Sequence, residues 1–259
     1  MSKPYYSVKF SSNNCRFEIR INDIPAVKYN LDGMVSSQVP LNQILLASGR
    51  QQLSVEVLPR KDEENLSKFS NLNITIQVRN LDADNSVERT ILEYSMPAIV
   101  DHTPYLKFYD KFEVELPYSL KGWKNSKELK KIDSIESETR SYFEYVHSIF
   151  AEKDFDTFKK ISESKFSELD KAFYTSQQDS DTEWNEFVDN LNKGEMILAN
   201  MLSDSETKLE FFGDGKIITL QKLNGEPALR FKNPAEKTQY SIPLLLHKPK
   251  GSTTLEVIR

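Results

Sequence analysis

The sequence predicts a mixed fold in which an N-terminal antiparallel β-sandwich is followed by an α+β domain. Apolar residues recur with a period of two up to about residue 116, then with helical spacing, and strand patterns return near the end. A chain of 259 residues is long enough for two ordinary domains. We expect a β-sandwich at 1–120 and an α+β domain at 121–259, with helices at about 126–200 packed on an antiparallel sheet at about 206–259.

Composition excludes several classes of protein. Hydrophobic residues make up 38% and charged residues 28%, as in ordinary globular proteins. The formal charge of -5 leaves no basic stripe for nucleic acid. The N-terminal residues lack the apolar run of a signal peptide, and no stretch approaches the roughly 18 apolar residues of a membrane span. We expect no nucleic-acid or membrane partner, and a cytoplasmic location, or a periplasmic one if the chain is a trimmed mature form.

Alternating apolar and polar residues mark the strands of the first half. The pattern occurs in "RFEIRI" at 16–21, "QLSVEV" at 52–57 and "LNITIQV" at 72–78, and further strands are expected near 5–10, 89–94 and 108–116. Cys15 is interpreted as a small residue at the start of a strand. One segment departs from the pattern: Leu41, Ile44 and Leu45 have helical spacing. It predicts a short helical turn that closes one end of the sandwich and is terminated by Gly49.

Helical spacing begins after a boundary segment at 116–129, which contains Pro, Gly, Ser, Asn and Lys. Apolar residues of a first long helix share one face, and two shorter helices follow in "DFDTFKKI" and "FSELDKAF". Ser180 and Glu183 have the spacing of a capping box and precede Trp184, so they predict the start of a last helix. The apolar face of the first helix comprises Ile132, Ile135, Tyr142, Val146, Ile149 and Phe150.

Strands return from about residue 208, and two Gly pairs punctuate them. Asp214-Gly215 and Asn224-Gly225 are typical of hairpin turns, because both central residues of such a turn need positive φ. The sequence after Asp214-Gly215 has the composition of a strand, whereas a phosphate-binding loop leads into a helix. Strands are expected at 208–212, 216–222, 227–232, 238–246 and 253–258, and the first three are expected to form a meander.

No catalytic motif emerges from the sequence. It contains no G-x-S-x-G elbow, P-loop or G-x-G-x-x-G fingerprint. His102 lies beside Asp101 in an expected loop, His147 flanks the apolar face of the first long helix, and His247 ends an expected strand. These three histidines lack the spacing of a metal site, and no cofactor is expected. Carboxylates of the helical segment, among them Glu136, Glu138 and Glu168, are expected on solvated helix faces.

Aromatic residues are concentrated in the helical segment. A few helices on a curved sheet can enclose a cavity, which such side chains would line. The alternative is that the rings fill a solid core, because helices need large apolar residues to cover a sheet. The candidate pocket residues are Tyr142, Tyr145, Phe158, Phe173 and Trp184.

Two resemblances bear on fold and function. The segment "YFEYVHSIFAEKDFDTFKKI" at 142–161 resembles the long first and short second helices of the NTF2-like, cone-shaped α+β domains. This resemblance implies helices over a curved sheet, although in that class a strand or hairpin interrupts the helices, and here they form one block. The first half resembles β-sandwich modules of bacterial proteins, and the whole chain is similar in style to bacterial accessory proteins and to immunity proteins that neutralise a toxin.

The function we expect is that of a non-enzymatic protein that binds another protein. The absence of a catalytic motif motivates it, and the acidic excess would suit a partner with a basic patch. The alternative is a small-molecule binder or hydrolase that uses the aromatic pocket. A third hypothesis, carbohydrate binding, requires Tyr5, Tyr6 and Tyr105 to be exposed on one face.

Overall fold

The chain divides into two compact units, Met1–Leu120 and Lys121–Arg259. The computed structural model describes residues 2–82, 87–193, 196–235 and 237–259. Residues 194–195 of the predicted helical region and residue 236 of the predicted sheet region lie outside the described residues. The fold is mixed, with antiparallel sheets in both units and α-helices in the second, as the sequence predicted.

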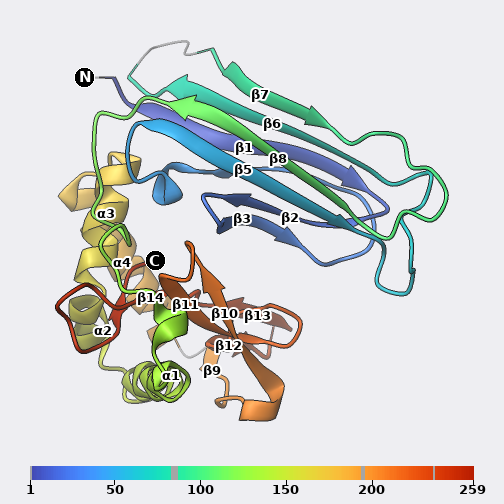
Figure 1. The fold of residues 1–259 in the computed structure, drawn as a ribbon. Helices are drawn as coiled ribbons and strands as arrows, with labels where there is room; N and C mark the ends of the chain where they lie inside the picture. The colour runs from blue at the N-terminus through green and yellow to red at the C-terminus, as the bar shows by residue number, and fades with distance from the viewer. Residues whose placement is uncertain (1, 83–86, 194–195, 236) are drawn as a thin grey trace. The chain divides into compact units, whose positions relative to one another are not determined.

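The described part of the first unit forms two four-stranded antiparallel sheets (Figure 1). One sheet has the strand order β4-β1-β6-β7 and the other the order β3-β2-β5-β8. The strands are β1 (Pro4–Asn13), β2 (Arg16–Ile21), β3 (Ile24–Tyr29), β4 (Val35–Pro40), β5 (Gly49–Leu58), β6 (Asn71–Asn80), β7 (Arg89–Ser95) and β8 (Leu106–Val114).

Alternate residues of these strands form the hydrophobic core of the first unit. Ile19, Val55 and Ile76 are at most 2% exposed, while the residues beside them in sequence are more accessible on several strands. Side chains of the two sheets touch each other. The ring centroid of Phe10 on β1 lies 5.4 Å from that of Phe17 on β2. The period of two in the sequence thus reports which side of each strand is buried.

A 3₁₀ turn, η1 (Asn42–Ile44), confirms the helical turn expected at this position. Leu41 and Leu45 beside it are fully buried. The Asn42 side chain is also buried; its oxygen accepts the Tyr6 N–H at 2.8 Å, and its amide donates to the Pro4 carbonyl at 3.0 Å. Gly49 does not terminate the turn: the backbone is already extended at Leu45, and Gly49, with φ of 109°, begins β5.

Cys15 lies directly before β2 and is completely buried. Its Sγ lies 3.4 Å from the Asn71 carbonyl oxygen, to which the thiol donates. Burial raises the pKa of this thiol, because a thiolate would lose its hydration there. Cys15 is the single cysteine of the chain.

Four α-helices follow one another in the described part of the second unit. The last begins one turn earlier than predicted: Ser176 is its N-cap, and its Oγ accepts the Asp179 N–H at 3.2 Å. Ser180 lies inside the helix, so the expected capping box at Ser180 and Glu183 is wrong. Ser176 and Asp179 have the same three-residue spacing. The helices are α1 (Ile135–Ala151), α2 (Phe155–Ile161), α3 (Glu163–Phe173) and α4 (Gln177–Asn192); a 3₁₀ turn, η2 (Leu129–Lys131), precedes them.

The described strands of the second unit form two antiparallel sheets, with the orders β10-β11-β14-β15 and β13-β12-β9. The antiparallel pairing expected for this region is present, and it is divided between these two sheets. The strands are β9 (Ile197–Leu198), β10 (Thr207–Phe212), β11 (Ile217–Lys222), β12 (Arg230–Asn233), β13 (Thr238–Ser241), β14 (Leu246–His247) and β15 (Glu256–Val257); a 3₁₀ turn, η3 (Asp204–Glu206), precedes β10.

Both Gly pairs turn the chain, but only the first gives the expected hairpin. Asp214 and Gly215 have positive φ, and β10 pairs with β11 across them. After Asn224-Gly225 the chain meets β11 at a bridge between Gln221 and Pro227 and then leaves to form β12. The Lys222 N–H donates to the Glu226 carbonyl at 2.8 Å and the Ala228 N–H to the Leu220 carbonyl at 3.3 Å, and no described β12 residue pairs with β11, so the expected three-stranded meander is limited to this short contact.

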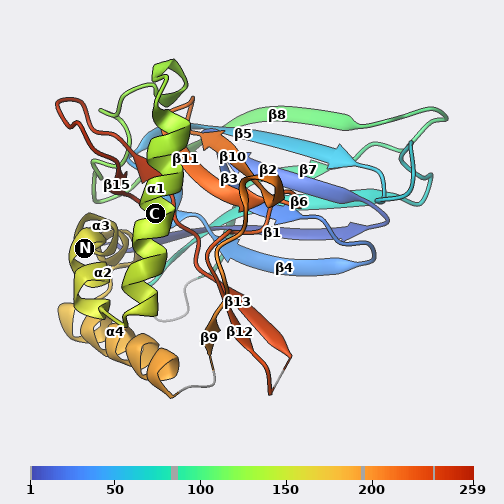
Figure 2. The same ribbon diagram turned by 90° about the horizontal axis from the view of Figure 1, so that it is seen from below.

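The core of the second unit lies between its helices and strands. Figures 1 and 2 show the helices gathered on one side of the strands, with α1 beside β11. Phe143, Val146 and Phe150 of α1 are buried together with Ile218 and Leu220 of β11. The apolar face predicted for the first long helix is confirmed from Ile135 onward; Ile132 lies before the helix and packs against the same core.

We predict that Phe143→Ala destabilises the second unit strongly. Phe143 is 1% exposed, so truncation leaves a cavity and lowers the free energy of unfolding by about 3–5 kcal/mol. Tyr145→Ala on the same helix is the matched control, because Tyr145 is 45% exposed and should cost less than about 1.5 kcal/mol. The measurement is urea denaturation followed by the helical circular dichroism signal. Equal losses in the two variants would contradict this account of the core.

Candidate functional site

Three loops of the first unit meet at one end of its sheets. They are the β3–β4 loop at 30–34, the β5–β6 loop at 59–70 and the β7–β8 loop at 96–105, and they lie at the right of Figure 1. The Lys61 N–H donates to Asp32 Oδ1 at 3.3 Å, which joins the first two loops. The Leu66 N–H donates to the Thr103 carbonyl at 2.7 Å, which joins the second and third. We call these three segments the loop end.

Large apolar side chains are exposed on the loop end. A single exposed Leu or Val is common in folded proteins, whereas several that gather on one surface mark interaction sites. Each of the three loops contributes at least one such residue. The exposed residues are Leu31 (68%), Met34 (80%), Phe69 (64%), Val100 (74%) and Tyr105 (53%).

Charges at the loop end are predominantly acidic. Five acidic residues stand against three basic ones in the three loops, a net charge of -2 with His102 neutral. Arg60 is shared between Asp32 and Glu63, at 3.9 and 3.8 Å, so its charge is already balanced within the loops. The acidic residues are Asp32, Asp62, Glu63, Glu64 and Asp101, and the basic residues are Arg60, Lys61 and Lys68.

A shallow hollow of about 320 Å³ lies on the outward face of β2, β5 and β8. Its charged side chains pair with one another, both within β2 and its following turn and between β5 and β8. Arg20 contacts Glu18 at 2.7 Å and Asp23 at 3.0 Å, and Lys107 contacts Glu56 at 3.1 Å. Such pairs stabilise a wet sheet face by a few tenths of a kcal/mol each, roughly. The hollow thus has a structural explanation that involves no ligand.

The surface required for carbohydrate binding is not formed. Tyr6 is 3% exposed, and its hydroxyl accepts the Glu115 N–H at 2.8 Å. Tyr5 is the neighbouring residue on β1, and neighbours in a strand point to opposite faces. Arg79 lies over the Tyr5 ring at 5.1 Å. Only Tyr105 of the three tyrosines is exposed, so this hypothesis is wrong as stated.

The predicted pocket residues lie on all four described helices of the second unit. Tyr142 and Tyr145 of α1 contact each other edge to face, with ring centroids 6.0 Å apart. Phe158 of α2 and Trp184 of α4 are stacked at 6.3 Å, and both belong to or pack against the hydrophobic core. Phe173 ends α3 and is half-buried. Four of the five therefore form two separate ring pairs.

Burial raises the pKa of Tyr142 to about 12, because its phenolate would be poorly hydrated among the surrounding residues. The neighbouring Tyr145 hydroxyl and the Glu256 carboxylate add to this effect. Tyr142 is therefore a neutral phenol at any physiological pH.

A buried hydrogen bond joins two residues that the sequence did not connect. Ser126 Oγ and His247 Nδ1 lie 2.7 Å apart, and both side chains are at most 4% exposed. His247 lies on β14, in agreement with the expectation that it ends a strand. Burial lowers the pKa of His247 to about 4, and the positive charge of Lys121 acts in the same direction. The imidazole is therefore neutral near pH 7.

Two carboxylates of the helices bind buried basic residues. Arg259 Nη1 donates to Glu168 Oε2 at 2.9 Å, and Lys248 pairs with Glu138. Arg259 and Lys248 are at most 7% exposed, so the expectation of solvated helix faces is wrong for Glu138 and Glu168. A buried cation needs a nearby anion, and these carboxylates provide it. The sequence held one signal for these ion pairs: Lys248 and Arg259 each follow apolar residues of the C-terminal strands.

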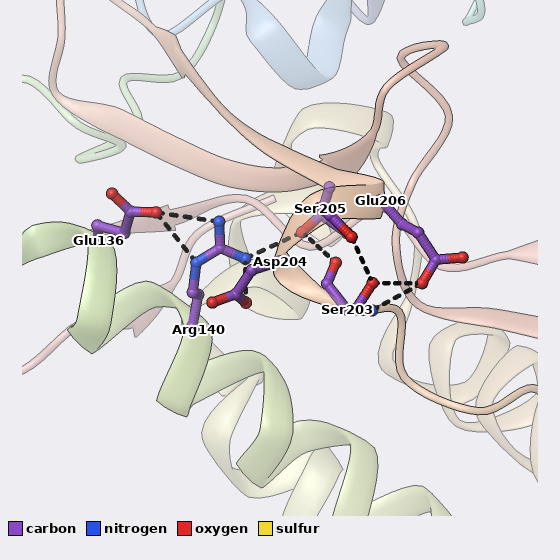
Figure 3. A network of polar contacts seen from close by, with 7 residues as sticks. Glu136, Arg140, Ser203, Asp204, Ser205 and Glu206 are labelled. Carbon is purple, nitrogen blue, oxygen red and sulfur yellow. Dashed lines mark hydrogen bonds and ion pairs between the residues drawn. The ribbon is translucent and has the colours of Figure 1, made fainter.

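A third polar network joins α1 to η3 (Figure 3). Arg140 contacts Glu136 at 3.0 Å and Asp204 at 2.9 Å, and it donates to Thr207 Oγ1 at 2.9 Å. Glu206 accepts the Ser203 N–H at 3.0 Å and completes a capping box there. Every group of this network has a partner inside the chain, so it holds two segments together.

Searches against models of known protein families, among curated proteins and among solved structures find no match for this chain. No helix in the described part of the chain combines the length and the apolar character needed to cross a membrane. Within residues 2–82, 87–193, 196–235 and 237–259, no three His, Cys, Asp or Glu side chains gather as metal ligands.

We predict that protonation of His247 weakens the fold. Its folded-state pKa of about 4 lies below the ordinary value of 6.5, so its contribution to stability is complete above pH 6.5. As the pH falls from 6.5 towards 4 this contribution is lost, which lowers the free energy of unfolding by an amount on the order of 1–3 kcal/mol. His247→Gln should flatten the pH dependence of the free energy of unfolding in this window.

The matched control is His102→Asn, at an exposed histidine with a left-handed backbone conformation that Asn tolerates. This variant should keep the pH dependence of the parent chain, measured by urea denaturation at each pH. The account of His247 fails if His247→Gln and the parent chain lose the same free energy between pH 6.5 and 4.

Proposed function

We propose that this chain is a non-enzymatic protein that binds another protein through the loop end of its first unit. The observation that carries the proposal is the set of five large apolar side chains exposed on three adjoining loops. Loops held by a rigid sheet scaffold are common positions for binding residues. The proposal treats the first unit as a β-sandwich, supported by its two antiparallel sheets and by the ring contact between Phe10 and Phe17.

Burial of the apolar residues would supply the affinity. Removal of one large apolar side chain from water contributes about 1.5–3 kcal/mol to the binding free energy, and the contributions of two or three such anchors add. Phe69 and Met34 are the best candidates for anchors, because aromatic residues and Met are enriched in protein interfaces. Lys68, whose Nζ lies 5.1 Å from the centroid of the Phe69 ring, would belong to the polar rim around them.

The partner surface is proposed to be apolar at its centre and basic at its edge. The net charge of -2 on the loop end motivates this assignment, since complementary charge accelerates association and excludes partners of like charge. The comparison with bacterial accessory and immunity proteins belongs to the same proposal, as does a cytoplasmic location. Both rest on the sequence pattern alone.

A pocket-based function, as a small-molecule binder or hydrolase, is the second candidate. It would use the aromatic residues of the second unit. We rank it lower because Phe158 and Trp184 stack on each other within the packing of the hydrophobic core, where their rings cover apolar surface. The loop end, in contrast, presents its apolar side chains to solvent.

We predict that a photo-reactive residue at position 69 cross-links one partner protein. Phe69→p-benzoylphenylalanine in the full-length chain should give a single adduct with extract of the native host, identified by mass spectrometry. Leu223 is the matched control position, because it is 63% exposed and Phe69 is 64% exposed. The same adduct from position 223, or none from position 69, would contradict the proposal.

The double variant Leu31→Ser with Met34→Ser should reduce the yield of this adduct at least about tenfold, since each lost anchor removes about 1.5 kcal/mol or more of binding energy and about 1.4 kcal/mol is a tenfold change in affinity. Its fold should be retained, because both side chains are exposed in the free chain. Circular dichroism and the urea midpoint check that point. An unchanged yield would place the partner elsewhere on the protein.

A further inference from the structure

Among the described strands of the first unit, four lie at sheet edges, and three of these carry protection against added strands along their length. An edge strand leaves backbone N–H and C=O groups without a partner, and natural sheets protect such edges with charges, proline or bulges. Strand β8 carries four charged residues, and β7 carries Arg89 and Glu93 and is bulged against β6. Strand β3 has Pro25 and Lys28, and its pairing with β2 is bulged.

Strand β4 is the exception. Its sequence "VSSQVP" contains no charge, and its six residues pair with β1 in continuous register from Val35 to Pro40. Ser36, Ser37 and Gln38 are exposed. Among the described strands β4 pairs with β1 alone. An uncharged, regular and exposed edge is the type of strand to which an extended peptide can add.

Alternation of the backbone shows which groups of β4 face outward. The Leu41 N–H donates to the Tyr6 carbonyl of β1 at 2.9 Å, so the amide of residue 41 points towards β1. Successive amides of an antiparallel strand point to opposite sides. The amides of residues 39, 37 and 35 therefore point to β1, and those of Gln38 and Ser36 point away. Position 40, the next outward one, is a proline and has no N–H to offer.

The outward amides lie at the end of β4 nearest to the loop end. Met34 directly precedes β4, and Leu31 lies in the same loop. Pro40 removes the outward donor at the opposite end of the strand. In chain order Leu31 and Met34 precede the outward amides of Ser36 and Gln38, and the side chains of all four residues are exposed.

We propose that β4 accepts an extended segment of the partner protein as an added strand, paired with the backbone of Ser36 and Gln38. The inference rests on the proposed function, and it names the part of the partner that is recognised. The paired residues of this segment are uncharged, because β4 offers no charge to complement. Next to them the segment presents an apolar residue to Leu31 and Met34 and a basic residue towards Asp32.

The test uses the full-length chain and a library of displayed random peptides about twelve residues long, which exceeds the roughly five or six residues of an average strand. Selected peptides are measured by fluorescence anisotropy against three variants. Ser36→Pro with Gln38→Pro removes both outward donors and leaves the amides that face β1. Ser36→Ala with Gln38→Ala removes the same side chains and keeps the donors. Leu31→Ser with Met34→Ser changes only the apolar anchors.

We expect the proline variant to weaken peptide binding at least about tenfold and the alanine variant to change it less than about threefold. Hydrogen exchange of the parent chain gives a second measurement that does not depend on the folding of any variant. Bound peptide should slow exchange of the Ser36 and Gln38 amides, which are unprotected in the free chain by the geometry above.

Three results would overturn the inference. In the first, peptides bind the Ser36→Pro, Gln38→Pro variant normally but lose affinity for the Leu31→Ser, Met34→Ser variant. Binding would then depend on the apolar residues of the loop end and not on an added strand. If no selected peptide binds this chain more tightly than an unrelated control protein, strand addition is rejected. The cross-link from position 69 still tests the loop end in that case. A dimer of the parent chain that the proline variant abolishes and the alanine variant keeps would assign the edge to a second copy.

Discussion

The need of every backbone N–H and C=O group for a hydrogen-bond partner shapes the first unit more than any other constraint. Eight short strands can satisfy most of these groups in two sheets, but four strands must then lie at edges. Charges on β8 and bulges at β3 and β7 are different responses to that requirement, whereas β4 has only Pro40 at its last position. The remaining outward amides of β4, at Ser36 and Gln38, follow the exposed Met34 in the chain.

The sequence predicted those features of the fold that repeat locally. Burial of one face of a strand requires the alternation seen at Phe17, Ile19 and Ile21, and burial of one side of a helix requires the spacing of Phe143, Val146 and Phe150. Partners far along the chain were not predictable in this way. Strand β12 follows a regular turn, yet it pairs with β9 and β13 instead of continuing beside β11, and a local pattern does not record that choice.

The same limit explains the outcome for the candidate sites. Glu138 and Glu168 have the local pattern of solvated helix residues, and their basic partners lie 110 and 91 residues away. Composition alone also does not separate an apolar residue that packs inside from one that stays outside. Leu31 and Met34 differ from core residues in one visible respect: they lie in a polar, Gly-containing loop between two strands, outside either period. That signal indicates exposure only after the ends of the two strands on either side are known.

The second unit keeps several polar groups away from water and pairs them. Arg259 with Glu168, Lys248 with Glu138 and Ser126 with His247 link the C-terminal strands to the helices and to the segment that precedes them. Such pairs add little net stability compared with apolar contacts of the same size, but separation of one pair is costly. They therefore favour one placement of the short strands β14 and β15 over alternatives that would leave a charge unmatched in the interior.

Cys15 gives the first unit an intrinsic reporter of its motions. A thiol reagent can reach this buried sulfur, which contacts Ser12 of β1 and Asn71 of β6, only when a local opening exposes it. Since the chain has no other cysteine, the labelling rate of the unmodified protein reports the openings that expose Cys15 and no other site. Ligands of the loop end could then be ranked by how far they slow labelling, with no tag or substitution introduced.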